Sequence, residues 1–283
     1  MENINWYPGH MKKTKELIRS NLKMVDLVIE VVDARIPVSS RNPMIDELTV
    51  GKPRLIVLNK SDLSDERQNK RWIESFEKGG ARALAMNSMS GAGVKQLFKL
   101  LGVIRAERQE TQSTLKKNKP MRMMIVGVPN VGKSSLINRM TGKKSTQTGD
   151  RPGVTKGKQW LTLKNGMQLL DTPGILWPKF EDRNIGLNLA FCGSIRDEIL
   201  DIASLGLEFI RYMQTAYPEL LIGRYKLDEV SEDALQTMES VALKRGFILP
   251  GKKIDYDRCA RTVLDEFRAG KIGKITLEQA EQE

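Results

Sequence analysis

Residues 127–134 restrict the possible folds of this chain more than any other segment. Their sequence, Gly-Val-Pro-Asn-Val-Gly-Lys-Ser, fits the pattern G-x-x-x-x-G-K-[ST]. A strand-like apolar run at 123–126 precedes them, and a helix-like run at 135–139 follows. In this context, glycine-rich backbone N–H groups and the positive end of a helix surround a phosphate. The segment predicts a phosphate-binding loop on an α/β sheet. The alternative is a glycine loop with a structural role only.

The side chains of this loop have distinct expected roles. We expect the Lys133 ammonium to reach the β- and γ-phosphates of a nucleotide as a catalytic group, and the Ser134 hydroxyl to bind Mg²⁺. The other cofactor-binding residues expected in this segment are Pro129, Asn130, Val131, Gly132 and Ser135. Together they would place the phosphates and their metal ion at the start of the helix.

A second motif that faces phosphate, Asp171-Thr-Pro-Gly174, ends a later predicted strand. An aspartate at this position can hold the Mg²⁺ ion through a water molecule. Gly174 lets its backbone N–H approach a γ-phosphate closely, because glycine has no Cβ. The pattern D-x-x-G is weak alone, but here it begins 44 residues after Gly127. That spacing links it to the phosphate-binding loop.

The segment Asn59-Lys60-Ser61-Asp62 follows another predicted strand and suggests recognition of a base. Guanine presents two adjacent donors, N1–H and the N2 amino group, and one carboxylate can accept from both. Adenine presents an acceptor at N1, so it would leave the carboxylate unpaired. Asp62 is the candidate for this carboxylate, with Asn59 and Lys60 as further nucleotide-binding residues. The alternative is a simple turn.

Apolar runs rich in β-branched residues alternate with helix-like stretches in the first part of the chain. The predicted strands are 27–32, 54–58, 83–86 and 123–126, and the predicted helices include 65–78 and 94–108. This alternation is typical of βαβ units in a parallel sheet. Asn165-Gly166 lies between two further strand-like runs and predicts a tight hairpin. One edge of the sheet is therefore expected to be antiparallel.

Beyond Pro178 the sequence pattern becomes helical. Predicted helices begin near Ser194 and cover 231–245 and 257–269. An earlier helix, predicted at 11–23, has basic side chains on one face and an apolar stripe of Ile18 and Leu22. We therefore predict an α/β domain over 1–178, which includes this N-terminal basic helix, and a small all-α domain over 179–283.

Charge indicates the kind of partner. The chain has 46 Lys and Arg against 35 Asp and Glu, giving a net charge of +11 and a pI of about 9.6. Such a chain favours a polyanion, with nucleic acid as the first candidate. Between 241 and 275, nine basic residues stand against four acidic ones. This stretch suggests contact with RNA phosphates, and the alternative is a solvated surface.

Composition limits the other kinds of site. Two distant cysteines, Cys192 and Cys259, and a single histidine, His10, exclude a disulfide framework, a cysteine zinc site and a site with several histidines. The apolar run at 27–32 is interrupted by Glu30 and is too short to span a membrane. With no signal-peptide pattern, we expect a cytoplasmic protein without a membrane partner.

Together, the three nucleotide motifs resemble the signature set of GTPases, but their order is unusual. In most GTPases the phosphate-binding loop comes first, whereas here Asn59–Asp62 precede it, as in a circularly permuted GTPase. The opening Trp6-Tyr-Pro-Gly-His10-Met11, the segment Asp33-Ala-Arg-Ile-Pro37 and the all-α tail resemble the ribosome biogenesis GTPase A family. The resemblance extends over essentially the whole chain.

This resemblance implies a circularly permuted P-loop GTPase domain followed by a helical RNA-binding domain. It implies hydrolysis of GTP to GDP with Mg²⁺ and K⁺, and a role in assembly of the large (50S) ribosomal subunit. The protein would bind the precursor particle and its rRNA in the GTP state and leave after hydrolysis. We expect it to be monomeric. The alternative is a GTP-binding switch on another RNA or particle, with little turnover.

The resemblance also assigns roles to individual residues. Asn87-Ser88-Met89 takes the place of the guanine-supporting S-A-K loop, although it departs from that pattern at every position. Residues 152–155 correspond to the switch I loop, in which Thr155 would supply a second hydroxyl to Mg²⁺. Asn130 corresponds to the asparagine that helps to hold K⁺ beside the phosphates.

The position after Gly174 raises the question of what orients the attacking water. Ras-like enzymes have glutamine there, but this chain has Ile175, which cannot orient water. The resemblance implies that His10 takes the catalytic position when the switch segments become ordered. The alternative is a structural histidine in the turn that leads into the basic helix.

Overall fold

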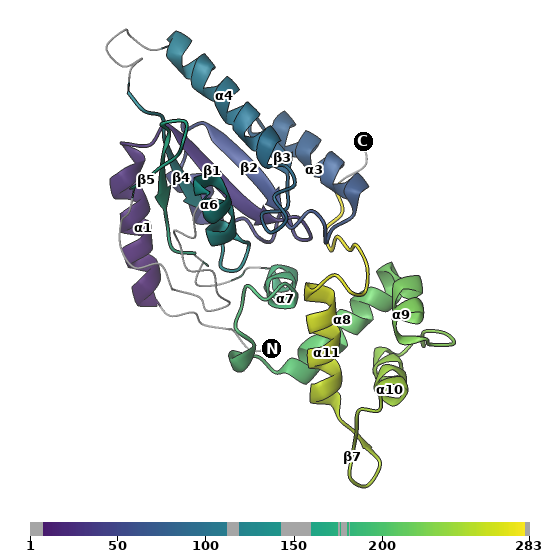
Figure 1. Ribbon diagram of the computed structural model, residues 1–283. Coiled ribbons are helices and arrows are strands. Elements are labelled where there is room, and N and C mark those ends of the chain that lie inside the picture. The colour runs from purple at the N-terminus through teal and green to yellow at the C-terminus, as the bar shows by residue number, and fades with distance from the viewer. Residues whose placement is uncertain are drawn as a thin grey trace. The chain divides into compact units, whose positions relative to one another are not determined.

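The strand-like runs of the first part of the chain form one mostly parallel sheet (Figure 1). The computed structural model describes residues 8–111, 119–142, 160–174, 176, 180 and 182–280, without side chains for 8–14 and 111. Within these residues the strand order is β3-β2-β1-β4-β6-β5. The strands are β1 Leu27–Asp33, β2 Arg54–Asn59, β3 Arg82–Ala85, β4 Arg122–Val126, β5 Trp160–Thr162 and β6 Gln168–Asp171. Only β5 runs antiparallel to its neighbour, as predicted.

Helices cover both faces of this sheet (Figure 1). The helices that precede or connect the strands are α1 Pro8–Leu22, α2 Pro43–Leu48, α3 Glu66–Lys78, α4 Val94–Thr111 and α6 Lys133–Thr141. The connections through α2 and α3 step along the sheet in one direction, and the connection through α4 steps back from β3 to β4. Because such crossovers are right-handed, α4 lies on the face opposite α2 and α3.

Two apolar clusters hold helices to one face of the sheet. Ile18 and Leu22 of α1 pack with Val28 of β1 and Leu170 of β6, which confirms the predicted apolar stripe of this helix. The second cluster joins Phe76 of α3 to alternate residues of the strands, Val32, Ile56, Leu58 and Ala83. The core of this unit therefore lies between the sheet and its helices.

The hairpin between β5 and β6 differs in detail from the predicted tight turn. The Leu163 N–H donates to Met167 O at 2.8 Å, and the Gly166 N–H donates to Leu163 O at 2.9 Å. The loop between the paired residues is therefore 164–166, one residue longer than an Asn-Gly turn. Asn165 accepts a hydrogen bond from the Met167 N–H through its side chain, which stabilises this longer loop.

A second unit, Gly186–Ile275, is mainly helical. Its elements, with α7 beginning just before it, are α7 Arg183–Phe191, the short 3₁₀ helix η1 Asp197–Ile199, α8 Ile202–Ala216, α9 Pro218–Tyr225, α10 Ala234–Arg245, the two-residue strands β7 Ile248–Leu249 and β8 Lys253–Ile254, and α11 Tyr256–Arg268. The helix predicted to begin near Ser194 instead begins at Ile202, because the Asp201 carboxylate accepts the Ser204 N–H and so provides the N-cap. The β7–β8 hairpin was not predicted.

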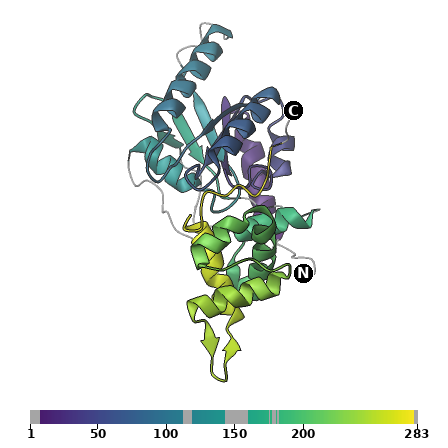
Figure 2. The same ribbon diagram turned by 90° about the vertical axis from the view of Figure 1, so that its right-hand side faces the viewer.

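The observed division of the chain differs from the predicted domains. The first unit comprises Met1–Ile185 and also Thr276–Glu283, whereas the prediction assigned everything from 179 to 283 to the second domain. Residues 276–280 run beside α3 in the first unit (Figure 2). The helical unit is thus inserted between two parts of the chain that fold together. Within the described residues, no helix is both long and apolar enough to cross a membrane.

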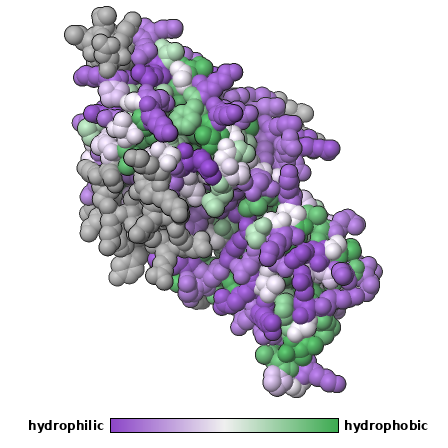
Figure 3. Space-filling view, viewed as in Figure 1, coloured by the Kyte–Doolittle hydropathy of each residue, from purple (hydrophilic) through white to green (hydrophobic). Residues whose placement is uncertain are grey.

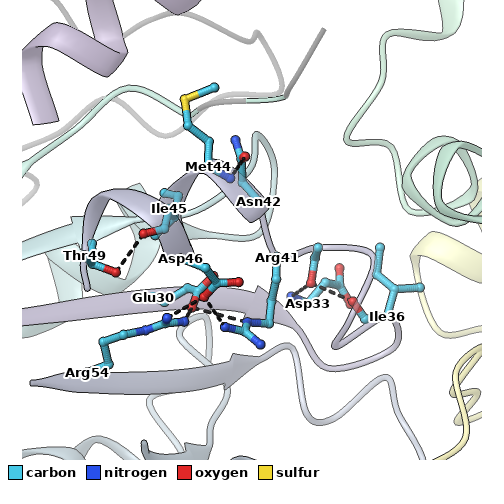
Figure 4. A network of polar contacts seen from close by, with 11 residues as sticks. Glu30, Asp33, Ile36, Arg41, Asn42, Met44, Ile45, Asp46, Thr49 and Arg54 are labelled. Carbon is cyan, nitrogen blue, oxygen red and sulfur yellow. Dashed lines mark hydrogen bonds and ion pairs between the residues drawn. The ribbon is translucent and has the colours of Figure 1, made fainter. Parts of the chain in front are cut away.

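A buried carboxylate organises the part of the sheet beneath α2 (Figure 4). Glu30 lies in the middle of β1 and only 1% of its side chain is exposed. Its Oε2 accepts from Arg54 at 2.6 Å and pairs with Arg41 at 3.4 Å. Both guanidinium groups also pair with Asp46 of α2. These four side chains fasten β2, α2 and the loop after β1 to the middle of the sheet.

We predict that Glu30→Ala lowers the free energy of unfolding by ~3 kcal/mol, because removing one member of a buried charge network leaves the others without compensation. Asp46→Ala is the matched control. The Asp46 side chain is 43% exposed, so its loss should cost less than ~1 kcal/mol. Urea unfolding measures both variants, and equal losses would contradict this account of the network.

Candidate nucleotide-binding site

The three predicted nucleotide motifs meet at one edge of the sheet. In the register of the sheet, Asp33 at the end of β1 lies beside Asn59 at the end of β2, and Asp171 at the end of β6 lies beside Ile125 of β4. Because these strands are parallel, the loops that follow them emerge at the same edge. The phosphate-binding loop, the D-x-x-G segment and the N-K-S-D segment therefore come together despite their permuted order.

The phosphate-binding loop begins directly after β4 and leads into α6, as its motif predicted. Gly132 is the N-cap of α6 and has a φ of 97°, a left-handed conformation that favours glycine. A Cβ at this position would also lie 2.2 Å from Asn59 Nδ2. Both the backbone conformation and the neighbouring amide therefore require glycine here. Among the other loop residues, Val131 is buried and Asn130 has a positive φ of 61°.

Lys133 is folded back onto its own loop. Its ammonium donates to Gly127 O at 3.0 Å and to Val128 O at 2.7 Å. Burial lowers the pKa of Lys133 to about 8, although the nearby Asp171 carboxylate favours the charged form. A polyphosphate at this loop would strengthen the charged state of the ammonium, because an adjacent opposite charge favours it.

Asp171 and Gly174 adjoin this lysine, as the spacing of the motifs predicted. Asp171 is buried, and its Oδ2 has no hydrogen-bond partner among the described residues. Burial raises the pKa of Asp171, against the opposing effects of Lys133 and the Thr172 N–H. A Cβ on Gly174 would lie 2.9 Å from Lys133 Nζ and 3.0 Å from the Pro129 backbone. Glycine thus permits the close approach of the two phosphate-side segments.

The unpartnered Asp171 oxygen bears on the expected magnesium ion. Buried polar atoms are nearly always satisfied, so this one is suited to a water or ion that accompanies the nucleotide. Ser134, at the start of α6, would provide the hydroxyl ligand. A protein site of one carboxylate plus hydroxyls, completed by phosphate oxygens, is the usual magnesium arrangement of P-loop enzymes. The described residues contain no separate cluster of three or more His, Cys, Asp or Glu side chains that could hold a metal.

The Asn59 side chain connects the base side of the site to the phosphate side. Its amide donates to Val131 O of the phosphate-binding loop at 2.7 Å. Its oxygen accepts from the Ser88 N–H at 2.9 Å and from the Ser88 hydroxyl at 2.8 Å. Asn59 is therefore a structural bridge between two loops, and Ser88 is one of its partners.

Lys60 is held by an ion pair with a buried carboxylate that the sequence motifs did not assign to the site. Its ammonium lies 2.9 Å from Asp33 Oδ2, and Arg35 also donates to the Asp33 carboxylate. Burial by itself would raise the pKa of Asp33, but Arg35 and Lys60 outweigh it and hold this pKa well below its ordinary value. In the sequence, the segment Asp33–Pro37 carries a family resemblance but matches no nucleotide-binding motif. The feature that could have indicated it is an acidic and a basic residue, Asp33 and Arg35, two positions apart at the end of a buried strand.

Asp62 and the loop at 87–91 complete the base side. Asp62 is exposed in the turn that follows Lys60. The Ser61 N–H donates to Met86 O at 3.1 Å, which joins this turn to the chain just before Asn87. The Asn87 side chain accepts from the N–H groups of Met89 and Ser90, so it stabilises its own loop. In this conformation Asn87 and Ser88 organise the loop through their side chains.

Arg139 is a further residue of the site that the motifs did not indicate. It lies near the end of α6, and its guanidinium donates to Ser88 O at 3.2 Å and also to Met89 O. The loop that replaces the S-A-K pattern is thus fastened to the helix that begins at Lys133. No motif includes Arg139, so the contact follows only from the packing of α6 beside this loop.

Two predicted site residues cannot be placed by side chain. Thr155 lies outside the described residues. His10 belongs to α1, and its side chain lies outside the described part of that helix. The remaining predicted residues of the phosphate-binding loop occupy the turn between β4 and α6 and the first turn of α6, as expected.

The chain is similar to known GTPases over nearly its whole length. It is 46% identical to the Ribosome biogenesis GTPase A of Bacillus cereus over 281 residues, which are 99% of this chain and 95% of that protein. A family model described as "50S ribosome-binding GTPase" matches residues 122–237.

Solved structures of YlqF from T. maritima have a similar fold. The GDP-bound structure has a TM-score of 0.66 and 30% identity, covering 94% of this chain and all of that one. The GNP-bound structure has a TM-score of 0.65 and 30% identity, covering 96% of this chain and all of that one. These likenesses confirm the predicted P-loop GTPase fold with a mostly parallel, permuted sheet.

We predict that Arg139→Gln weakens GDP binding about fivefold, because a net hydrogen bond contributes ~1 kcal/mol and the loop at 87–91 would lose its contact with α6. Arg71→Gln is the control, since Arg71 is an exposed residue of α3 for which the described residues provide no ion pair. Fluorescence titration with a labelled GDP measures both. Equal affinities for Arg139→Gln and the control would contradict the role of Arg139.

Proposed function

Because the chain belongs to the ribosome biogenesis GTPase A family, we propose that it acts on the precursor of the large ribosomal subunit, to which it binds in the GTP state and from which hydrolysis releases it. The protein is a GTPase with a role in ribosome assembly. One observation supports the nucleotide site most directly: Lys133, Asp171, Gly174 and Asn59 lie together at the carboxyl edge of the sheet.

Guanine selection is assigned to the exposed carboxylate of Asp62. It would accept from N1–H and from the N2 amino group of guanine, beside the loop at 87–89, whose N–H groups already donate to acceptors within the protein. Lys60, held by Asp33, is positioned between this turn and the end of β1. Adenine would leave the Asp62 carboxylate without donors, which is a strong basis for its rejection.

The phosphates are assigned to the loop of Pro129–Ser135 and to Gly174. Ser134, Thr155 and Asp171 would hold Mg²⁺, and Asn130 would contribute to a K⁺ site. When bound, these cations offset the negative charge that develops on the phosphate oxygens during transfer. Lys133 would move from the carbonyl groups of its own loop to the β- and γ-phosphates. The unpartnered Oδ2 of Asp171 supports its place near the metal.

We assign orientation of the attacking water to His10. Ile175 follows Gly174 in the place where Ras-like enzymes have a glutamine, so another side chain must hold the water. His10 belongs to α1, a helix whose apolar stripe fixes it to the sheet. Slow turnover of the free protein follows, with docking on the particle completing the site.

Ribosomal RNA is the proposed partner of the helical unit. Of its nine basic residues between 241 and 275, three are engaged in ion pairs: Lys244 with Asp228, Arg245 with Glu266, and Arg268 with Asp197. The other six form no ion pair among the described residues: Lys252, Lys253, Arg258, Arg261, Lys271 and Lys274. The face of this unit in Figure 3 is mainly hydrophilic. These charges suit contacts with RNA phosphates. We further propose that the protein acts in the cytoplasm as a monomer.

We predict that purified large subunits accelerate GTP turnover in potassium buffer by at least ~10-fold, and that His10→Ala abolishes most of this acceleration, as expected for a group that orients the water. Glu16→Ala is the control, because Glu16 is an exposed residue of the same helix. The rate of GTP turnover by the unmodified protein and by both variants is measured as phosphate release. Absence of stimulation would contradict the hydrolytic cycle on the particle. If GTP-dependent binding to the subunit persisted, the alternative of a switch with little turnover would replace it.

A further inference from the structure

The last described residues, 276–280, form a tail that returns from the helical unit to the first unit (Figure 2). Thr276, Leu277 and Ala280 are buried there. The hydrogen bonds of the tail connect residues more than 200 positions apart in the sequence. These hydrogen bonds anchor the tail to two separate segments of the first unit.

The first anchor is the loop that follows β1. The Leu277 N–H donates to Arg35 O at 2.8 Å. The Glu278 carboxylate accepts from the Val38 N–H at 2.6 Å and from the Ser39 N–H at 2.9 Å, and it also accepts from the Ser39 hydroxyl. One carboxylate therefore satisfies several donors of this loop, and charge-assisted bonds of this kind are stronger than neutral ones.

The second anchor is the start of α3. The Asp65 N–H donates to the Thr276 hydroxyl at 3.0 Å, and Asp65 is the N-cap of this helix. Further along α3, the Trp72 indole N–H donates to Glu278 O at 3.0 Å. The Ala280 N–H donates to Gln68 Oε1 at 3.0 Å. The tail thus joins the loop after β1 to the first two turns of α3.

The two segments that the tail anchors lie on either side of the turn that contains Lys60 and Asp62. Arg35, on one side, binds the Asp33 carboxylate, which in turn holds the Lys60 ammonium. Asp65, on the other side, lies three residues after Asp62, and only one short turn separates them. The tail therefore contacts the elements that determine where Lys60 and Asp62 can lie.

We propose that Thr276 and Glu278 are positioning residues for guanine recognition. They hold the loop after β1 and the start of α3 at a fixed separation, so that the turn between β2 and α3 presents the Asp62 carboxylate to the base. This inference rests on the proposed assignment of Asp62 to guanine. The tail continues directly from Ile275. The polypeptide chain therefore connects the helical unit to the residues that we propose to position Asp62.

The test uses IDP, which lacks the N2 amino group of guanine, beside GDP. The ratio of the two dissociation constants reports the Asp62 contact and is insensitive to a general loss of folded protein. For Glu278→Gln in the full-length chain, we expect GDP to bind about tenfold more weakly and the IDP/GDP ratio to fall by about threefold. Glu74→Gln, the same change at an exposed position of α3, should leave both values unchanged.

A second variant keeps the test decisive if Glu278→Gln folds poorly. Thr276→Val keeps the shape of the side chain but removes the acceptor of the Asp65 N–H, and it should lower the ratio by a smaller factor. An unchanged ratio in folded Glu278→Gln or Thr276→Val would overturn the role of the tail. If the unmodified protein did not prefer GDP to IDP, the assignment of Asp62 itself would fail, so the two failures are distinguishable.

Discussion

The nucleotide site depends on the hydrogen bonds that the Asn59 side chain makes to two separate loops. This side chain donates to the phosphate-binding loop 72 residues away and accepts from the loop at Ser88, 29 residues away. In the permuted order these three loops are distant in sequence, so only the parallel register of β1, β2, β3 and β4 brings them together. The geometry of a GTPase site therefore survives a change in the order of its motifs.

Much of the phosphate side could be predicted from the sequence, because its requirements are local. The glycines, the lysine and the hydroxyl of residues 127–134 form one continuous segment, and the D-x-x-G motif follows its own strand. Arg139 and the Asp33–Arg35 pair were missed as site residues, because their contacts arise from packing between separate elements. The fold was predictable from apolar periodicity, whereas the start of α8 depended on which of several acidic residues becomes the cap.

The contacts of the tail at 276–280 could not be predicted from the sequence, for a different reason. Its five residues contain no motif, and their partners lie at the other end of the chain. The result is a helical unit that is inserted within the first unit, with the D-x-x-G segment shortly before it and the tail after it. Both the phosphate side and the base side of the nucleotide site therefore have a covalent connection to the unit that we assign to RNA.

We place a guanine nucleotide at the carboxyl edge of this sheet, with Asp62 as the group that selects the base. The most direct measurement compares GTP and XTP binding to the unmodified protein and to Asp62→Asn. The amide of asparagine matches the N1–H and the C2 carbonyl of xanthine, so preference should shift from GTP toward XTP by at least ~100-fold. A variant that keeps its preference for GTP would contradict the account.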